Sequence, residues 1–330
     1  MNTEHNRNRR IALKWFGTST ISLTLAGNGL ADEAHGRRLI VPAEAGGGID
    51  SVARLLSYAL SRDAAAASVV LNRPGASGNL GAAQAARSDA DGETLLITGA
   101  NHLSSPLLMP NAGFDPVADF SPLVRLALAP SVVLVSEALK GVPLVGASSA
   151  KPIATRQLSF GSAGYGHSSH LAVERFKAVT RAPWLHVPYK GTAPALRALM
   201  GGEVQVVFAP LSSVVTAVQT GRAHAIAVAH NTRLSSLPQV PTLSELGVLH
   251  AEYLQWYGVL MPRTHQEVLL NGLAQELLRA AGSSVFTTSL ERLGLEPGLL
   301  PRKEFRAFLE TEMSRVKQFL STHLVDRPVI

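Results

Sequence analysis

The sequence predicts an α/β protein of two domains, each with an open sheet, and a ligand cleft between them. Short apolar segments alternate with helical patterns along the chain. Two glycine-rich segments, far apart in the sequence, each lie between an apolar segment and a helical pattern. The chain has 330 residues, 46% hydrophobic and 16% charged, which suits two folded domains. Open α/β sheets bind ligands at the carboxyl ends of their strands, so two such junctions facing each other would form a cleft.

The short apolar segments are the expected strands, and their alternation with helices favours parallel pairing. They are residues 39–41, 69–71, 95–98, 132–135, 158–160, 204–208 and 225–229. Three helices are expected at 167–179, 193–202 and 212–221, because each pattern ends near polar residues or glycine. Apolar side chains share one face over about four turns from Phe305 to Leu320. That face predicts a last helix docked on the outside of a domain.

The first glycine-rich segment, AGGGID at residues 45–50, leads into an expected helix. The first N–H groups of a helix have no partner within the helix, and together with the helix dipole they favour an anion. We therefore expect the amides of Gly47 and Gly48 to contact a ligand. Asp50 is the expected N-cap. Because its charge would repel an anion, we expect it to orient the loop or to meet a cationic or hydroxyl group of the ligand.

The second glycine-rich segment follows the expected strand at 158–160 and precedes another helix. Gly161, Gly164 and Gly166 allow positive φ and a close approach of the backbone to a ligand. Ser162 and Ser168 either contact that ligand or simply cap the helix, because serine is a preferred N-cap residue. The segment predicts a second anion site.

The charge pattern excludes a nucleic-acid-binding protein. Half of the formal net charge of +6 comes from residues 1–31, which hold four basic residues and one glutamate, and no dense Lys/Arg stripe follows them. Aromatic residues make up only 5% of the chain. Neither the electrostatic nor the stacking pattern of a nucleic-acid binder is present.

Residues 1–31 predict an export signal. They contain a basic start, an apolar stretch too short to span a membrane, and small residues at Gly29 and Ala31 for cleavage. The paired arginines at positions 9 and 10 resemble a twin-arginine signal, but Ala12 stands where phenylalanine is usual, so the export route stays open. The chain has no cysteine, which excludes disulfides, a thiol nucleophile and a thiolate metal site.

Two groups of polar residues suggest an enzyme, but neither pattern is complete. Ser168 lies beside His167 and His170, yet a nucleophile elbow needs glycine two residues after the serine, where His170 stands. His167, His170 and Glu174 could present metal ligands on one helical face. An ordinary surface pair of His170 and Glu174 explains the spacing equally simply. We expect no catalytic residues and no metal.

A dinucleotide cofactor is also not expected. The loop at 160–169 has a different glycine spacing from the dinucleotide fingerprint, and no acidic residue ends the next expected strand at 186–188. We expect no cofactor.

The chain resembles the tripartite tricarboxylate transporter receptors, the Bug-type extracytoplasmic solute-binding proteins, over nearly everything after Arg38. Eight segments in the same order carry the resemblance, which makes it specific. They are AGGGID at 45–50, NRPGASGNLGA at 72–82, DGETLL at 91–96, DPVADFSPL at 115–123, FGSAGYGHSSHL at 160–171, HVPYKGTAPAL at 186–196, LPQVPTLSELG at 237–247 and WYGVLMP at 256–262.

This resemblance implies a fold of the periplasmic-binding-protein type (type II-like). Residues 32–130 and 254–330 would form one domain and residues 131–253 the other, with the chain crossing twice. A small carboxylated solute would bind in the cleft through loop amides, hydroxyls and ordered waters. The implied protein is a periplasmic monomer that closes on its solute and delivers it to the permease subunits of a tripartite transporter. A sensor that docks on a membrane signalling protein is the alternative.

The resemblance also implies the ligand-binding residues, motif by motif. They are Gly47, Gly48, Asp50, Asn101 and His102 in the first domain, and Ser162, Gly166, His167, Ser168 and Thr192 in the second. The family commonly has aspartate after the phenylalanine that is Phe208 here, whereas this chain has Ala209. Loss of that acceptor predicts a ligand without an ammonium group: a keto acid, a plain dicarboxylate or an aromatic acid.

Overall fold

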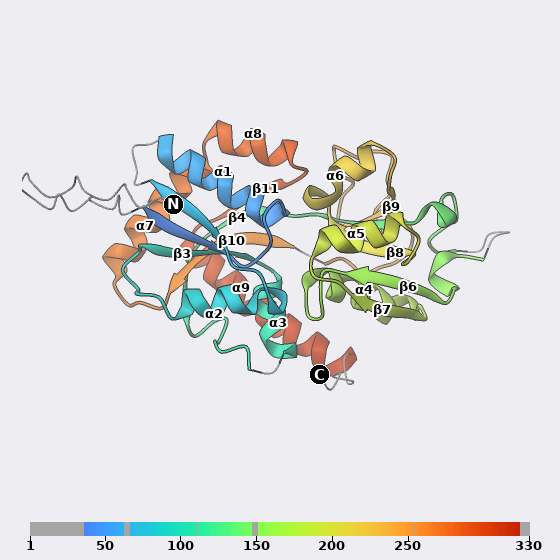
Figure 1. Ribbon diagram of the computed structural model, residues 1–330, viewed down its shortest axis with the longest axis horizontal. Coiled ribbons are helices and arrows are strands. Elements are labelled where there is room, and N and C mark those ends of the chain that lie inside the picture. The colour runs from blue at the N-terminus through green and yellow to red at the C-terminus, as the bar shows by residue number, and fades with distance from the viewer. Residues whose placement is uncertain (1–35, 63–66, 110, 147–150, 254, 324–330) are drawn as a thin grey trace, which may run out of the picture. The chain divides into compact units, whose positions relative to one another are not determined.

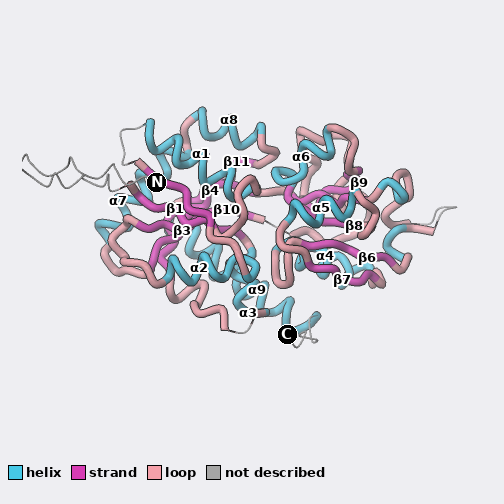
Figure 2. Tube along the Cα trace, in the orientation of Figure 1, coloured by secondary structure: helices cyan, strands magenta, loops and turns pink. Residues whose placement is uncertain are grey.

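The computed structural model describes residues 36–62, 67–109, 111–146, 151–253 and 255–323. The expected export signal at 1–31 lies outside the described residues. Within them, the strands form one six-stranded and one five-stranded sheet, shown in Figures 1 and 2. None of the described helices is both long enough and apolar enough to cross a membrane.

The six-stranded sheet has the order β11-β4-β10-β3-β1-β2 and combines strands from both ends of the chain. β1 pairs in parallel with β2 and β3, whereas β10 is antiparallel to β3 and β4, and β11 is antiparallel to β4. The strands are β1 (Arg37–Val41), β2 (Ser68–Asn72), β3 (Thr94–Gly99), β4 (Phe120–Leu128), β10 (Trp256–Pro262) and β11 (Glu296–Leu300).

Helices cover both faces of this sheet. Strand side chains alternate between the faces, so Leu39 and Val41 belong to one apolar cluster and Ile40 to the other. The first face carries α1 (Gly48–Arg62), α7 (Glu267–Ala281) and α8 (Ser284–Arg292). The second face carries the short helix η1 (Ala76–Gly78) with α2 (Asn79–Ala86), α3 (Asn101–Leu108) and α9 (Arg302–His323). This sheet with its helices is called the first half below.

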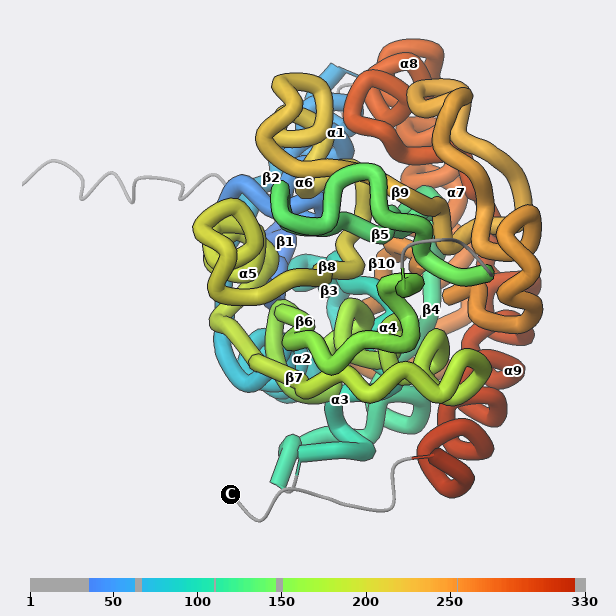
Figure 3. The backbone as a smooth tube through the Cα atoms, turned by 90° about the vertical axis from the view of Figure 1, so that its right-hand side faces the viewer, coloured from blue at the N-terminus to red at the C-terminus, as the bar shows by residue number. Residues whose placement is uncertain are grey.

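The five-stranded sheet has the order β7-β6-β8-β5-β9 and forms, with its helices, the second half. β6 is parallel to β7 and β8, and β5 is antiparallel to β8 and β9. Its strands are β5 (Ser131–Val135), β6 (Leu158–Ser162), β7 (Trp184–Pro188), β8 (Val206–Pro210) and β9 (His224–Ala229). Figure 3 shows α4 (Ser168–Thr180) on one side of it, and α5 (Thr192–Met200) with α6 (Leu211–Gln219) on the other. Two single turns, η2 (Glu137–Leu139) and η3 (Ile153–Thr155), lie between β5 and β6.

The structure confirms the α/β fold class. Six of the seven expected strand segments lie within a strand, and the seventh, 204–208, overlaps β8 from Val206 onward. The expectation of purely parallel sheets is wrong, because β4, β5, β10 and β11 run antiparallel to their neighbours. β5 and β10 are the strands by which the chain enters one sheet after leaving the other, and both run antiparallel to their neighbours. Such an entry leaves no pattern in the local sequence. The last helix packs on the sheet as expected, through Phe305, Leu309 and Met313.

The chain passes between the halves through Ala129 and Pro130 and returns through a segment ending at Gln255. These two crossings are bonded to each other. The Ala129 N–H donates to the Gln255 carbonyl at 2.9 Å, and Gln255 Nε2 donates to Ser131 Oγ at 2.6 Å. The division into domains at residues 130 and 254 stays a prediction.

Candidate ligand-binding site

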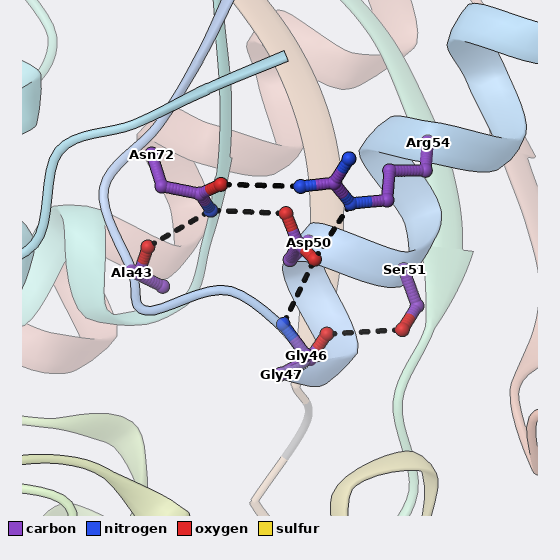
Figure 4. Close-up of polar contacts among 7 residues, drawn as sticks. All are labelled: Ala43, Gly46, Gly47, Asp50, Ser51, Arg54 and Asn72. Atoms are coloured by element: carbon purple, nitrogen blue, oxygen red, sulfur yellow. Dashed lines mark hydrogen bonds and ion pairs between the residues drawn. The ribbon is translucent and has the colours of Figure 1, made fainter.

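The first glycine loop is held by the buried carboxylate of Asp50 (Figure 4). Its Oδ2 accepts hydrogen bonds from the Gly46 N–H and from Arg54 Nε, both at 2.9 Å. Its Oδ1 accepts from Asn72 Nδ2 at 2.9 Å, and the same amide donates to the Ala43 carbonyl at 3.1 Å. Asp50 therefore lies within α1 and reaches back to orient the loop. The expectation that it is the N-cap is wrong, because α1 already begins at Gly48.

The Asp50 network also controls the charge beside the loop. Burial raises the pKa of the Asp50 carboxyl, but hydrogen bonds from Arg54, Gly46 and Asn72 outweigh burial and hold that pKa below its ordinary value. Asp50 is therefore ionised at neutral pH, and the Arg54 guanidinium compensates its charge. The repulsion that a bare carboxylate would exert on a bound anion is reduced.

The N–H groups at the start of α1 are available to a ligand. Of the hydrogen bonds found in the described part of the chain, none is donated by the backbone N–H groups of residues 47–50. A Cβ atom on Gly48 would lie 2.5 Å from Ser212 Oγ and 2.7 Å from Tyr257 Oη. Ser212 opens α6 in the second half, so the start of α1 meets the start of another helix and a buried tyrosine hydroxyl. Burial raises the pKa of Tyr257 to about 12, so its hydroxyl stays protonated.

The second glycine loop, residues 161–167, uses many of its N–H groups internally. The Ala163 N–H donates to Ser169 Oγ at 2.9 Å, and the Gly164 N–H donates to Ser162 Oγ at 3.2 Å. The Gly166 N–H donates to His170 Nδ1 at 3.2 Å. These amides hold the loop in shape. Of the two interpretations of its serines, the structure favours a local role for Ser162, whose hydroxyl is buried.

The N-cap of α4 is His167, a residue that the sequence did not suggest as a cap. Its Nδ1 accepts from the Ser169 N–H at 3.3 Å. Ser168 instead donates to Gln255 Oε1 at 2.9 Å, which ties the start of α4 to the segment that returns to the first half. The hydroxyl of Ser168 therefore has a structural partner.

Two glycines of the second loop make room for the first half. Gly164, at φ +136, would place a Cβ atom 2.8 Å from Ser77 Oγ, and Gly166, at φ +75, would place one 3.3 Å from the Ser105 Cα. From the sequence, we expected these glycines to let the backbone approach a ligand. In this structure their missing side chains allow α3 and the turn before α2 to approach the loop.

Histidine and aromatic rings stack behind the second loop. The His170 and His186 rings lie 4.0 Å apart between centroids, with Phe160 4.8 Å from His186 and Tyr165 5.0 Å from His170. His186 Nε2 lies 2.6 Å from Ser162 Oγ. Burial lowers the pKa of His186 to about 4 and, with the neighbouring cations, that of His170 to about 2. Both imidazoles are therefore neutral at pH 7.

His170 and Glu174 lie close to each other, but the pair is not on the surface, where it was expected. His170 is 1% exposed, and its Nε2 lies 3.8 Å from Glu174 Oε1, which also accepts from Lys177 Nζ at 2.8 Å. Over the described ranges, no group of three or more His, Cys, Asp or Glu side chains is arranged to hold a metal ion.

Two expected site residues lie inside apolar layers. His102 donates from Nε2 to the Pro116 carbonyl at 2.9 Å and stacks on Phe114, and burial lowers the pKa of this imidazole to about 4. The side chain of Ala209 is fully buried in the cluster beneath α5 and α6. His102 thus has a packing role in the first half, and an aspartate in place of Ala209 would be surrounded by apolar side chains.

Two further expected site residues lie beside the second loop. Asn101 Nδ2 donates to the Ser77 carbonyl at 2.8 Å, which holds the turn that faces Gly164. Thr192 begins α5, and the N–H of the preceding Gly191 donates to the Ala163 carbonyl at 3.2 Å. Asn101 therefore lies close to the second loop through its bond to Ser77, and Thr192 through the bond of the preceding Gly191 to Ala163.

The expected residues thus form two groups. Gly47, Gly48 and Asp50 meet Tyr257 and the start of α6, whereas residues 162–168 meet η1, α3 and the start of α5. Tyr257 belongs to the first group, and a Cβ atom on Gly99, its partner at the end of β3, would lie 3.0 Å from its ring. Sequence reasoning missed Ser77, Ser212 and Tyr257 as parts of this region. Ser77 and Tyr257 lie in segments that carry the family resemblance, but no local pattern marks these two residues or Ser212 as part of a site.

Two mixed sheets with helices on both faces, joined by two crossings, define the class of periplasmic binding proteins. A model of the tripartite tricarboxylate transporter family receptor matches residues 52–323. A UPF0065 protein encoded in a Pseudomonas intergenic region is 31% identical over 258 residues, covering 78% of this chain and 77% of that protein. Protein BugT of Bordetella pertussis is 29% identical, covering 84% and 86%.

Solved structures agree with this match. A protein of R. palustris solved with adipate has a TM-score of 0.80 and 31% identity, covering 87% of this chain and 97% of its own. MatC from Rhodopseudomonas palustris with bound malate has a TM-score of 0.76 and 27% identity, covering 86% and 98%. The chain belongs to the tripartite tricarboxylate transporter receptor family, as its Bug-type motifs suggested, and it is a solute-binding receptor.

Proposed function

We propose that this chain is a periplasmic receptor that binds a small carboxylate at the start of α1, closes its two halves around it, and delivers it unchanged to a membrane permease. The observation that carries the proposal is the set of unused N–H groups at residues 47–50, opposite the hydroxyls of Ser212 and Tyr257. A carboxylate is the group that such donors and the positive end of a helix dipole stabilise. The relatives solved with adipate and malate support this class of ligand.

The same geometry disfavours a ligand with an ammonium group. An ammonium needs an acceptor, usually a carboxylate, and the carboxylate of this loop belongs to Asp50. Both of its oxygens already accept hydrogen bonds, from Gly46, Arg54 and Asn72. We therefore keep the prediction of a dicarboxylate, keto acid or aromatic acid, now on the basis of Asp50 and not of Ala209.

Closure follows from binding between two halves. A ligand that gains contacts from both halves binds the closed form more tightly and shifts the population toward it.

The Ser162 and His186 pair resembles a nucleophile with its base, but the buried Ser162 hydroxyl is not accessible to a substrate. A binding role without turnover is the simpler use of these residues.

A thermal-shift screen tests the proposal. Adipate, malate, 2-oxoglutarate and benzoate are compared with glutamate, which matches 2-oxoglutarate except for its ammonium group. A ligand at 100 times its Kd adds about 2.7 kcal/mol to the free energy of unfolding. At least one of the four acids should raise Tm well above the shift seen with glutamate. No shift with any acid would contradict the proposal, and recovery of a chemically altered ligand would indicate an enzyme.

A pair of glycine variants locates the site. Gly48→Ala places a methyl group 2.5 Å from Ser212 Oγ and should abolish the ligand-induced shift. Gly272→Ala, in α7 with open space around it, should keep the shift and add up to about 1 kcal/mol through helix propensity. Loss of uptake of the identified acid in cells that lack the permease would distinguish transport from sensing.

A further inference from the structure

The second glycine loop is bonded to the first half through two successive carbonyl groups. Ser77 Oγ donates to the Tyr165 carbonyl at 2.8 Å, and Ser104 Oγ donates to the Gly166 carbonyl at 2.9 Å. Ser104 is fully buried. Each serine hydroxyl has one proton, so neither can donate to a ligand while these bonds exist.

The turn that presents Ser77 has an unusual backbone. Residues Gly75 to Gly78 all have positive φ, at 123, 48, 53 and 99 degrees. Two of the four, Ala76 and Ser77, are not glycine, and each such residue costs about 1 kcal/mol or more. The Asn101 amide holds the turn through the Ser77 carbonyl at 2.8 Å. The surrounding contacts keep a costly conformation that places the Ser77 hydroxyl against the second half.

Gly164 is complementary to this turn. A Cβ atom at Gly164 would lie 2.8 Å from Ser77 Oγ, which is closer than real Cβ contacts come. The missing side chain on one half therefore accommodates the serine from the other. Gln255, by contrast, bonds the two crossings and Ser168 where the halves are covalently joined. If the two halves rotated about the crossings, Ser77 would move away from the second loop. The Gln255 contacts lie near the axis of that rotation and would be kept.

We propose that Ser77 and Ser104 form a closure latch: their bonds to the Tyr165 and Gly166 carbonyls stabilise the closed form and set ligand affinity without contact with the ligand. The latch holds part of the population closed even in the absence of ligand. Its effect on affinity rests on the function proposed above, because the apparent Kd equals the intrinsic Kd divided by the closed fraction. Its effect on the distance between the halves does not depend on that function.

The experiment uses two spin labels on introduced cysteines, which is direct because the chain has none of its own. Val268 in the first half and Leu185 in the second are 90% and 69% exposed and suit labelling. Distance distributions are recorded without ligand for the labelled parent, Ser77→Ala, and Ser77→Ala with Ser104→Ala. Ser57→Ala is the matched control, because it removes a serine bond to a backbone carbonyl inside the first half, at 3.0 Å from Ser68 O.

The labelled parent should show a population at the separation found in this structure. Ser77→Ala should reduce that population several-fold, the double variant should reduce it further, and Ser57→Ala should leave it unchanged. A parent with no such population, or a double variant that matches the parent, would overturn the latch. For any acid that binds, such as adipate, the double variant should raise the dissociation constant about tenfold. If the serine variants shift the distribution but none of the tested acids binds the parent, the latch is supported and the proposed function is contradicted.

Discussion

The two glycine loops share one sequence pattern, a strand followed by glycines and a helix, but the structure uses them differently. The first loop is oriented by one charged side chain, Asp50, and leaves the N–H groups of residues 47–50 unused. The second is oriented by serine and neutral histidine side chains that accept its N–H groups. Its glycines admit the other half of the protein. A glycine-rich junction can therefore serve either a ligand or a contact between the halves. Which of the two it serves depends on the side chains that accept hydrogen bonds from its amide N–H groups.

The largest expected effect is a loss of stability in acid, to which the second loop contributes through two buried histidines. His170 Nδ1 can accept the Gly166 N–H only while the imidazole is neutral, and burial lowers the pKa of His170 to about 2 and that of His186 to about 4. Because these values lie below 6.5, the unfolded chain binds more protons, and stability falls as the pH drops below about 6.5. Each such histidine costs about 1.4 kcal/mol per pH unit in that range. Urea unfolding at pH 7, 6 and 5 measures the loss.

The first loop provides the contrast in the same titration. The folded-state pKa of Asp50 is lowered, so its contribution is fully present above about pH 3.8 and is lost only below it. His170→Asn retains an acceptor near the position of Nδ1 but cannot titrate, so its stability should fall less steeply between pH 7 and 5. An equal slope in this variant and the parent would show that His170 does not control the second loop.

Asp50→Ala should have the next largest effect, and it acts on the first loop. The change leaves Gly46, Asn72 and Arg54 without their shared acceptor, and removing one member of a buried charged network costs about 3 kcal/mol. Binding of any acid that shifts Tm should also be lost, because the loop is no longer held. Arg54→Ala is the control: Arg54 is 56% exposed, so its loss should cost much less than the loss of Asp50.

The sequence predicted much of the fold because its strand segments are short, apolar and bounded by turns. Segments such as residues 95–98 and 132–135 are central and fully buried, and no alternative structure suits them. The direction of strand pairing could not be predicted from local patterns. β10 enters the six-stranded sheet only after the chain has returned from the second half at Gln255, and it then runs antiparallel to both of its neighbours. Tertiary contacts, not local patterns, place Trp256–Pro262 between β3 and β4.

The two glycine loops were predicted, but their contacts were not. The sequence located both loops, because glycine and helix-start signals are local. It could not show that Ser77 and Ser104 face the second loop, since those contacts join residues 88 and 62 positions apart. It also placed His102 in the site, although Phe114 and Phe120 enclose that ring within the first half.

Matched glycine variants give a smaller effect and separate the two loops directly. Gly164→Ala puts an L side chain at φ +136 and 2.8 Å from Ser77 Oγ, so we expect a loss of about 2 kcal/mol. Gly47→Ala has ordinary φ, and its Cβ atom would lie 3.6 Å from the Glu44 carbonyl, so stability should change by less than about 0.5 kcal/mol. Chemical denaturation of both variants measures the difference. Equal losses would mean that the two loops use their glycines in the same way.

The smallest expected effect comes from exchanging the cap of α4. His167 Nδ1 accepts the Ser169 N–H as N-cap, and burial lowers the pKa of this imidazole to about 4, so protonation in acid destroys the cap. His167→Ser supplies a preferred cap that does not titrate. At pH 7 the free energy of unfolding should stay within about 1 kcal/mol of the parent, whereas at pH 5 the variant should be the more stable of the two. His167→Ala removes the acceptor altogether and should be less stable than His167→Ser at both pH values. If the serine and alanine variants unfold alike, the cap contributes nothing to stability.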